Sequence, residues 1–297
     1  MTEKPHKAGF VNIVGNPNVG KSTLMNALVG EKLSIITSKA QTTRHRIMGI
    51  VNGEDFQIVY SDTPGVLKPN YKLQESMLKF STGALSDADV ILYVTDVFEQ
   101  ADKNADYLAK VAASDIPVIV VINKIDKTTP EQLDELAQQW MKLLPRAMIV
   151  PTSALTKFNT DSIIDRIIKL LPEAPPYFEK DALTDKSMRF FTSEIIREKI
   201  LLHYEKEIPY STEVVVEEYL ESPKIDRISA TIYVIRQSQK GILIGHKGTK
   251  LKWVGTDARK DLEAFLGKKV FLELFVKVRE DWRDDESSLR NFGYIND

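Results

Sequence analysis

The segment from Gly15 to Ser22 constrains the fold most, because it has the spacing of a Walker A phosphate loop. It reads Gly-Asn-Pro-Asn-Val-Gly-Lys-Ser and follows the apolar run Phe10–Val14, and a helical pattern comes next, as this motif requires. The glycines let backbone N–H groups turn toward phosphate oxygens beside a helix N-terminus. Lys21 can then reach the β- and γ-phosphates, and Ser22 can hold Mg²⁺. The motif predicts that the chain binds a nucleoside triphosphate through Gly15, Asn16, Pro17, Asn18, Val19, Gly20, Lys21, Ser22 and Thr23.

The composition limits the class of protein. The chain has 297 residues, enough for two domains that each bury a core. Its formal net charge is −2, so a nucleic-acid site would have to come from local clustering of basic residues. It contains no cysteine, which excludes disulfides, thiolate metal sites and a cysteine nucleophile. The first residues lack the apolar core of a secretory signal, and no apolar run approaches the about 20 residues of a spanning helix. We therefore expect a cytoplasmic protein.

The first ~170 residues alternate short apolar runs with longer helical patterns, which predicts an α/β fold with a mostly parallel sheet. The expected strands are Phe10–Val14, Asp55–Ser61, Val90–Thr95, Pro117–Ile122 and Ala147–Pro151. The expected helices are Ser22–Val29, Leu73–Ala84, Ala101–Ala113, Glu131–Leu144 and Asp161–Leu171. The continuous apolar runs in the third and fourth strands suit positions buried on both faces.

A proline-rich stretch after Leu171 ends this pattern. We expect a first domain over residues 1–172, a linker over 173–186 and a second domain over 187–297. The second domain has a different order: a helix at Thr192–Tyr204, strands at Val214–Leu220 and Arg227–Ile235, a helical region, and a strand at Val270–Val278. This order predicts a smaller α+β domain.

Asp62-Thr63-Pro64-Gly65 follows the second expected strand. Asp62 at this place can hold Mg²⁺ through water, and the N–H of Gly65 can meet the γ-phosphate, with Thr63 and Pro64 shaping the turn. The pattern is weak alone, but it lies at the position expected after the phosphate loop.

Asn123-Lys124-Ile125-Asp126 closes the fourth expected strand. The carboxylate of Asp126 can accept hydrogen bonds from guanine N1–H and from its 2-amino group, a pair of donors that adenine lacks. A site built for this pairing rejects the wrong base strongly. Ser153 and Ala154 follow the next strand and are expected to shape the same pocket, together with Asn123 and Lys124.

The second domain contains Gly245-His246-Lys247-Gly248, which resembles the Gly-x-x-Gly loop of KH domains. That resemblance implies a type II KH domain that clamps the backbone of single-stranded RNA. We expect this element to come after a strand and before a helix. Basic residues surround it while Asp257 is the lone acid in the segment, as expected at a phosphate backbone. The expected RNA-binding residues are Gly245, His246, Lys247, Gly248, Lys240, Lys250 and Lys252.

With these motifs in order, the chain resembles the Era family of bacterial ribosome-associated GTPases over essentially its whole length. The resemblance implies a Ras-like P-loop domain that hydrolyses GTP to GDP and phosphate, with Lys21, Thr43 and Gly65 as catalytic groups. It implies a first switch over residues 40–46, in which we favour Thr43 over Thr42 as the Mg²⁺ ligand beside Ser22 and Asp62. Val66 replaces the glutamine that orients water in Ras-like enzymes.

In related GTPases an asparagine at the position of Asn18 binds K⁺, so this ion is a second expected cofactor. Arg44 and Arg46 are candidate charge-stabilising groups in cis, although solvated or RNA-facing arginines are the commoner case. The resemblance further implies a monomer that binds the 3′ end of 16S rRNA and acts in assembly of the 30S subunit. Peripheral association with the cytoplasmic side of the inner membrane is a family trait for which no motif here argues independently.

Three alternatives stay open at this point. The chain can be a slow, nucleotide-gated RNA-binding module with little intrinsic hydrolysis. It can be a metabolic P-loop kinase, which Asn123-Lys124-Ile125-Asp126 disfavours. A Der-like GTPase also ends in a KH-like domain, but that family carries two GTPase domains and this chain has one Walker A motif.

Overall fold

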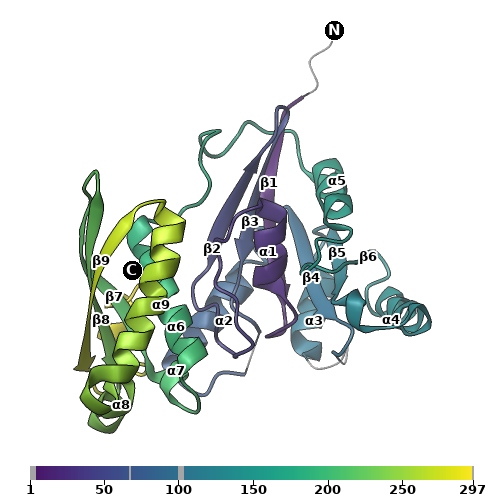
Figure 1. Ribbon diagram of the computed structural model, residues 1–297. Coiled ribbons are helices and arrows are strands. Elements are labelled where there is room, and N and C mark those ends of the chain that lie inside the picture. Colours follow the sequence, from purple (N-terminus) through teal and green to yellow (C-terminus); the bar gives the residue numbers. More distant parts are fainter. Residues whose placement is uncertain (1–4, 67, 100–103, 296–297) are drawn as a thin grey trace. The chain divides into compact units, whose positions relative to one another are not determined.

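The computed structural model describes residues 5–66, 68–99 and 104–295 (Figure 1). The chain forms two compact units. The first consists of Met1–Pro69 and Met77–Asp185, and the second of Asn70–Ser76 and Lys186–Asp297. Each unit has its own sheet, so the two are described separately. No helix within the described ranges is both long enough and apolar enough to cross a membrane.

The first unit is built on a six-stranded sheet with the order β2-β3-β1-β4-β5-β6. Its strands are β1 (Lys7–Gly15), β2 (Ile47–Asn52), β3 (Phe56–Asp62), β4 (Val90–Asp96), β5 (Val118–Asn123) and β6 (Met148–Pro151). All neighbouring pairs are parallel except β2 and β3. Every residue of β4 is buried, as a central strand covered on both faces requires. The expected parallel α/β architecture is confirmed.

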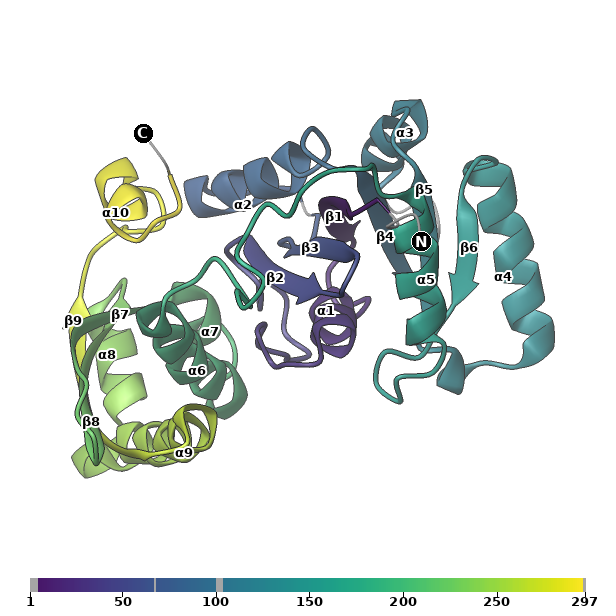
Figure 2. The same cartoon turned by 90° about the horizontal axis from the view of Figure 1, so that it is seen from above.

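The described residues up to Asp185 form the helices α1 (Lys21–Val29), α2 (Lys72–Gly83), α3 (Ala105–Ala113), α4 (Pro130–Leu143) and α5 (Thr160–Leu170). A buried cluster joins α3 and α4 to one face of the sheet, with Tyr93 and Trp140 packed at a ring distance of 5.3 Å. Helix α1 lies on the side of the sheet opposite α3 (Figure 2). Residues 101–103 of the helix expected at Ala101–Ala113 lie outside the described residues.

Strand β2 is absent from the sequence-based prediction. It is a short edge strand that runs antiparallel to β3, and Gly49 interrupts its apolar pattern. A Cβ at Gly49 would come within 2.8 Å of side-chain atoms of Met25 and Val29. A larger residue at this position would have to push these side chains aside where the strand passes α1. The glycine interrupts the apolar pattern by which a strand is recognised in a sequence.

The second unit contains a three-stranded sheet with the order β7-β8-β9, in which β7 and β8 are antiparallel and β8 and β9 are parallel. Its elements are α6 (Met188–His203), α7 (Ile208–Ser211), β7 (Glu213–Leu220), β8 (Ile225–Val234), α8 (Gln237–Ile244), α9 (Thr249–Leu266), β9 (Lys269–Val278) and α10 (Glu286–Asn291). The predicted order of helix, two strands, helical region and strand is confirmed, and the helical region consists of α8 and α9. Helices α7 and α10 are short additions to this order.

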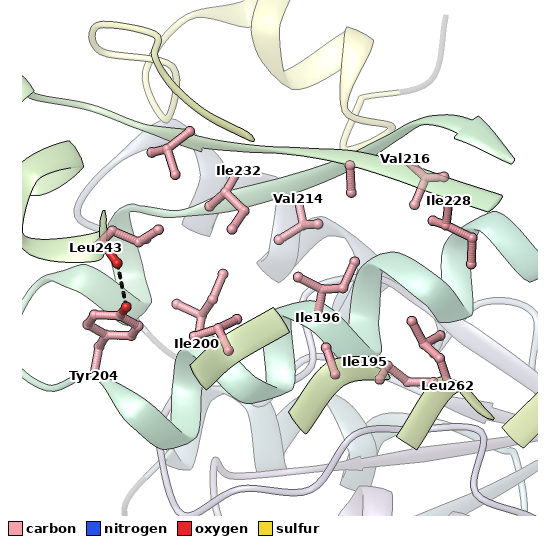
Figure 3. Close-up of a cluster of buried hydrophobic side chains, with 14 of the residues drawn as sticks. Ile195, Ile196, Ile200, Tyr204, Val214, Val216, Ile228, Ile232, Leu243 and Leu262 are labelled. Carbon is pink, nitrogen blue, oxygen red and sulfur yellow. Dashed lines mark hydrogen bonds between the residues drawn. The ribbon is translucent and has the colours of Figure 1, made fainter. Parts of the chain in front are cut away.

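The core of this unit lies between one face of the sheet and the helices (Figure 3). Ile232 and Val216 point from the strands toward Ile196 and Ile200 of α6. The hydroxyl of Tyr204 donates to the backbone oxygen of Leu243 at 2.6 Å, which ties the chain after α6 to α8. Trp253 of α9 is 60% exposed.

The structure places the predicted linker and the start of α2 differently from the expected domain boundaries. The linker segment through Asp185 groups with the first unit. Residues 70–76 group with the second unit, where the N–H of Leu73 donates to the oxygen of Arg283 at 2.9 Å. Within that unit, Lys72 Nζ also pairs with Glu286 at 3.0 Å. Sequence patterns show neither grouping because both depend on long-range backbone contacts.

We expect Leu243→Ala to destabilise the second unit by about 2–5 kcal/mol, because truncation of a fully buried leucine leaves a cavity. Ile242→Ala is the matched control, since this neighbouring side chain is 43% exposed and should cost less than about 1 kcal/mol. Hydrogen exchange of the amides of β8 and α9 as a function of denaturant measures both. Equal losses in the two variants would contradict this assignment of the core.

Candidate nucleotide and RNA sites

The loop between β1 and α1 has the backbone of a phosphate cradle. Gly15 and Gly20 have φ of 144° and 98°, values that side chains rarely allow. A Cβ on Gly15 would lie 2.1 Å from the oxygen of Val94, and one on Gly20 would lie 2.2 Å from Nδ2 of Asn123. Both glycines are therefore required by space as well as by conformation.

Lys21 lies inside this loop. Its ammonium donates to the backbone oxygens of Gly15 at 3.1 Å and of Asn16 at 2.8 Å. Burial lowers the pKa of Lys21 to about 8, although Asp62 and Glu99 act in the opposite direction. A phosphate group at the loop would supply the negative charge that favours the protonated form.

Ser22, Thr43 and Asp62 converge beside the loop, although they come from three separate segments. The Ser22 hydroxyl donates to Asp62 Oδ2 at 2.7 Å and lies 2.8 Å from the hydroxyl of Thr43. Thr43 Oγ1 is 3.5 Å from the same carboxylate oxygen. The hydroxyl of Thr42 instead bonds to Thr37 at 2.7 Å and to the oxygen of Lys39 at 2.5 Å. Thr43, the threonine favoured from the sequence, is thus the one that contacts Ser22 and Asp62.

This cluster has the donor set of a hard divalent cation. Asp62 is fully buried, and its Oδ1 has no hydrogen-bond partner within the described part of the chain. Burial raises the pKa of Asp62, while the hydroxyl of Ser22 and the charge of Lys21 lower it. Carboxylate and hydroxyl oxygens are the ligands that Mg²⁺ prefers, and the ion would favour the ionised carboxylate. The residues present therefore fit Mg²⁺.

The turn after β3 packs directly on the phosphate loop. A Cβ on Gly65 would meet atoms of Pro17 at 2.8 Å, and the N–H of Val66 donates to the oxygen of Gly15 at 3.2 Å. The hydroxyl of Thr63 donates to the backbone oxygen of Ile13 at 2.8 Å. The side chain of Val66 is buried in the cluster that includes Tyr107. The position that holds a water-orienting glutamine in Ras-like enzymes is thus part of the core here.

The expected base-recognition residues meet at the carboxyl ends of β5 and β6. Asn123 braces the site, because its Nδ2 donates to the backbone oxygen of Val19 at 2.9 Å and its Oδ1 accepts from the N–H of Ala154 at 2.9 Å. Asp126 Oδ1 accepts from the hydroxyl of Ser153 at 2.7 Å. That hydrogen bond is the main reason why the pKa of Asp126 is lowered. An ionised acceptor is what recognition of two guanine donors requires.

Sequence reasoning missed two residues of this region. Asp96 ends β4 and pairs with Lys124 Nζ at 2.6 Å, and the same ammonium donates to the oxygen of Asn18 at 2.6 Å. Asn104 bonds through its side chain to Asn16 and to the oxygen of Val66. The place of Asp96 at the end of a buried parallel strand is a signal that could have identified it. Asn104 carries no such signal.

A cavity of about 350 Å³ opens beside the loop. It is lined by the loop and by the first-switch segment, including Asn18, Ser22, Ile36, Lys39, Thr43 and Gly65. Arg44 and Arg46 are not among its lining residues. The guanidinium of Arg46 is held by Asp87 at 2.5 Å and by Ser61 at 2.6 Å, and Arg44 is fully buried. Within the described ranges, no group of three His, Asp or Glu side chains could hold a further metal ion.

In the second unit, the Gly-x-x-Gly element lies between the helices α8 and α9. The expectation that it directly follows a strand is therefore wrong, whereas the helix expected after it is present. Gly245 has φ 73° and ψ 179°, and Gly248 has φ 78° and ψ 8°. The intervening residue Lys247 also has a positive φ of 49°. This backbone forms a tight turn in which His246 and Lys247 are exposed at the tip.

The basic residues expected near this turn are accessible. Lys250 and Lys252 are exposed on the first turns of α9, and Lys240 of α8 is half-buried. Asp257, the acid of the segment, already pairs with His203 at 2.8 Å and with Lys260 at 3.7 Å. A positively charged strip with the exposed indole of Trp253 therefore follows the turn, an arrangement suited to a phosphate backbone and unpaired bases.

Comparisons with known proteins match both parts of the chain. A family model described as 50S ribosome-binding GTPase matches residues 10–124, and a KH domain model matches residues 207–283. The GTPase Era of Staphylococcus haemolyticus is 45% identical over 299 residues, which cover 100% of this chain and 99% of the relative. The GTPase Era of Syntrophus aciditrophicus is 46% identical over 97% of this chain and 95% of its own length.

Solved structures show the same likeness. A crystal structure of Era in complex with MgGDPNP and nucleotides 1506–1542 of 16S ribosomal RNA has a TM-score of 0.94 at 42% identity, covering 98% of this chain and all of that one. A variant of Aquifex aeolicus Era bound to GDP·AlF4⁻ has a TM-score of 0.93 with the same identity and coverage. These full-length matches exclude the kinase and Der-like alternatives and confirm the P-loop GTPase and KH architecture. The chain belongs to the Era family of GTPases.

Proposed function

We propose that this GTPase binds the 3′ end of 16S rRNA through its KH domain and uses the nucleotide state to control its role in assembly of the 30S subunit. The likeness over the whole chain to Era in complex with MgGDPNP and a 16S rRNA fragment carries this proposal. The positively charged turn in the second unit and the guanine-type pocket in the first supply the two matching sites.

In this proposal the loop residues Gly15–Thr23 cradle the phosphates, with Lys21 balancing the charge on the β- and γ-phosphates. Asp126 accepts from guanine, while Ser153 fixes its carboxylate and Asn123, Lys124 and Ala154 hold the pocket in shape. Thr63 and Pro64 shape the turn that brings Gly65 to the γ-phosphate.

Ser22, Thr43 and Asp62 would hold Mg²⁺, which supplies positive charge at the phosphates when it is bound. Water attacks the γ-phosphorus, the bond to the β–γ bridging oxygen breaks, and GDP and phosphate result. Loss of the γ-phosphate releases Thr43 and Gly65 from their contacts, so both switch segments can move. A change in RNA affinity then requires that the two nucleotide states bind RNA differently.

The rate of hydrolysis separates a proficient enzyme from the slow, nucleotide-gated module. The side chain of Val66 is buried and can neither donate nor accept a hydrogen bond, so it does not orient water. Single-turnover hydrolysis with and without RNA and K⁺ distinguishes the two cases.

Peripheral membrane association and a cytoplasmic location stay predictions.

Asp126→Asn should weaken GTP binding by roughly 10²-fold or more, because an amide cannot accept from both guanine donors. Xanthosine triphosphate should bind better to the variant than to the wild type, since its O2 accepts from the new amide N–H. Calorimetry with both nucleotides measures the change. Asp134→Asn, an exposed acid on α4, is the control and should bind GTP normally. An unchanged preference in Asp126→Asn would contradict the assignment.

We propose that the side chain of Asn18 holds K⁺ near the phosphates and speeds hydrolysis. Asn18 has φ 67°, so Asn18→Gly removes the side chain without straining the backbone. We expect faster single-turnover hydrolysis in K⁺ than in Na⁺ for the wild type, and equal rates in the two salts for Asn18→Gly. GTP affinity should change little. A K⁺ effect that survives in the variant would place the ion elsewhere.

The RNA assignment is tested at Gly248, where a Cβ would meet no atom within 4 Å. Its left-handed conformation is one that Asn and Asp tolerate best among residues with side chains. Gly248→Asp should reduce affinity for an RNA with the 3′-terminal sequence of 16S rRNA by about tenfold or more, because it adds a negative charge at the phosphate path. Gly248→Asn is the uncharged control of the same shape. Equal binding by both variants, or a loss of GTP binding, would overturn the assignment.

A further inference from the structure

The segment that was expected to be a free linker is bound along the edge of the first sheet. We call residues 177–185 the strap. At its start, the N–H groups of Tyr177 and Phe178 donate to Oε1 of Gln57 at 2.7 and 3.0 Å, and Gln57 Nε2 donates to the oxygen of Phe178 at 2.8 Å. Gln57 is fully buried in β3. Lys180 Nζ adds bonds to the oxygens of Gly53 at 2.8 Å and Phe56 at 3.1 Å.

The end of the strap pairs with β2, the edge strand. The N–H of Ile50 donates to the oxygen of Leu183 at 2.8 Å, and Gly49 forms an antiparallel bridge with Thr184. The N–H of Met48 donates to Asp185 Oδ1 at 2.9 Å, while the Thr184 hydroxyl donates to the oxygen of Met48 at 2.7 Å. The N–H groups of Met48 and Ile50 are thus satisfied by the strap on the side of β2 that faces away from β3.

Strand β2 is also the continuation of the first switch. Thr43, which contacts Ser22 and Asp62, precedes Ile47 by four residues. At about 3.3 Å per residue, no more than roughly 13 Å of chain separates Thr43 from the start of β2. A displacement of Thr43 can therefore pull directly on this strand. The other end of the hairpin is Asp62, so both ends of β2–β3 lie at the cation cluster.

The strap leads directly into the second unit. Asp185 is followed by Lys186 and by Ser187, whose hydroxyl accepts from the N–H of Phe190 and caps α6. Two residues leave little slack between the bonds to β2 and the first residue of this helix, Met188. A movement of β2 along its own axis therefore has to stretch this connection, break the strap bonds or move the start of α6.

We infer that the strap is a mechanical connection that carries the state of the first switch from β2 to α6 of the KH unit. The inference deepens the proposed function and rests on it, because it names the covalent route by which nucleotide controls RNA binding. The alternative is that the strap only covers the edge of the sheet, as many proteins require. In that case its bonds would be the same in both nucleotide states.

Hydrogen exchange on the full chain separates these two cases. We expect the amides of residues 182–190 to exchange at rates that differ by about threefold or more between the GDP form and the form with a non-hydrolysable GTP analogue. Identical exchange in the two forms would overturn the inference. This readout does not involve RNA, so it stands even if RNA affinity proves independent of nucleotide, a result that would refute the proposed function alone.

The double substitution Thr184→Val with Asp185→Ala removes the two side-chain bonds to Met48 and leaves the nucleotide site intact. We expect the ratio of RNA affinities in the GTP-analogue and GDP forms to move toward one by about fivefold or more, with unchanged GTP affinity. Asp181→Ala is the matched control, since this exposed acid lies in the same strap four residues earlier.

A second variant guards against misfolding of the first. Two glycines inserted between Asp185 and Lys186 keep every bond of the strap and lengthen only the connection to α6. This insertion should also abolish the difference between nucleotide states, while exchange of residues 177–185 stays as in the wild type. A wild-type ratio in both the insertion and the double variant would show that the connection runs elsewhere.

Discussion

The structure depends on the tight packing of the phosphate loop, whose backbone turns sharply in a small space. Only glycine fits at Gly15 and Gly20, where a Cβ would lie 2.1–2.2 Å from Val94 and Asn123. The second of these contacts is with the residue that also braces the base pocket. The phosphate loop and the base pocket are therefore packed against each other through Asn123, so a substitution in one is expected to disturb the geometry of the other.

The parallel sheet explains why distant segments form one site. Strands β1, β3, β4, β5 and β6 run in the same direction, so their carboxyl ends meet at one edge. Asp62, Asp96 and Asn123 each end a strand there. The antiparallel strand β2 is the exception, and it leads away from this edge toward the strap. The fold thus places chemistry on the parallel strands and a mechanical connection on the antiparallel one.

Local patterns predicted the buried strands, the phosphate loop and the Gly-x-x-Gly turn, because hydrophobic periodicity and glycine spacing depend only on residues that are close together in the sequence. Long-range contacts could not be predicted in this way. Gly49 interrupts the apolar pattern of β2 where the strand passes close to α1, so the strand could not be recognised from the sequence. Asn104 bonds to Asn16, which is far away in the sequence, and no residue spacing indicates this contact. The polar residues before Lys186 have the composition of a linker, yet an isolated bridge and a backbone hydrogen bond hold them against β2 at the edge of the sheet.

The central claim is that the nucleotide in the first unit governs how strongly the second unit holds RNA. Titration of the intact wild-type protein with a 16S rRNA 3′-end fragment, once with GDP and once with a GTP analogue at fixed salt and Mg²⁺, tests it most directly. We expect affinities that differ by at least about fivefold between the two states. Equal affinities would contradict it, because a ligand that binds both states alike shifts neither.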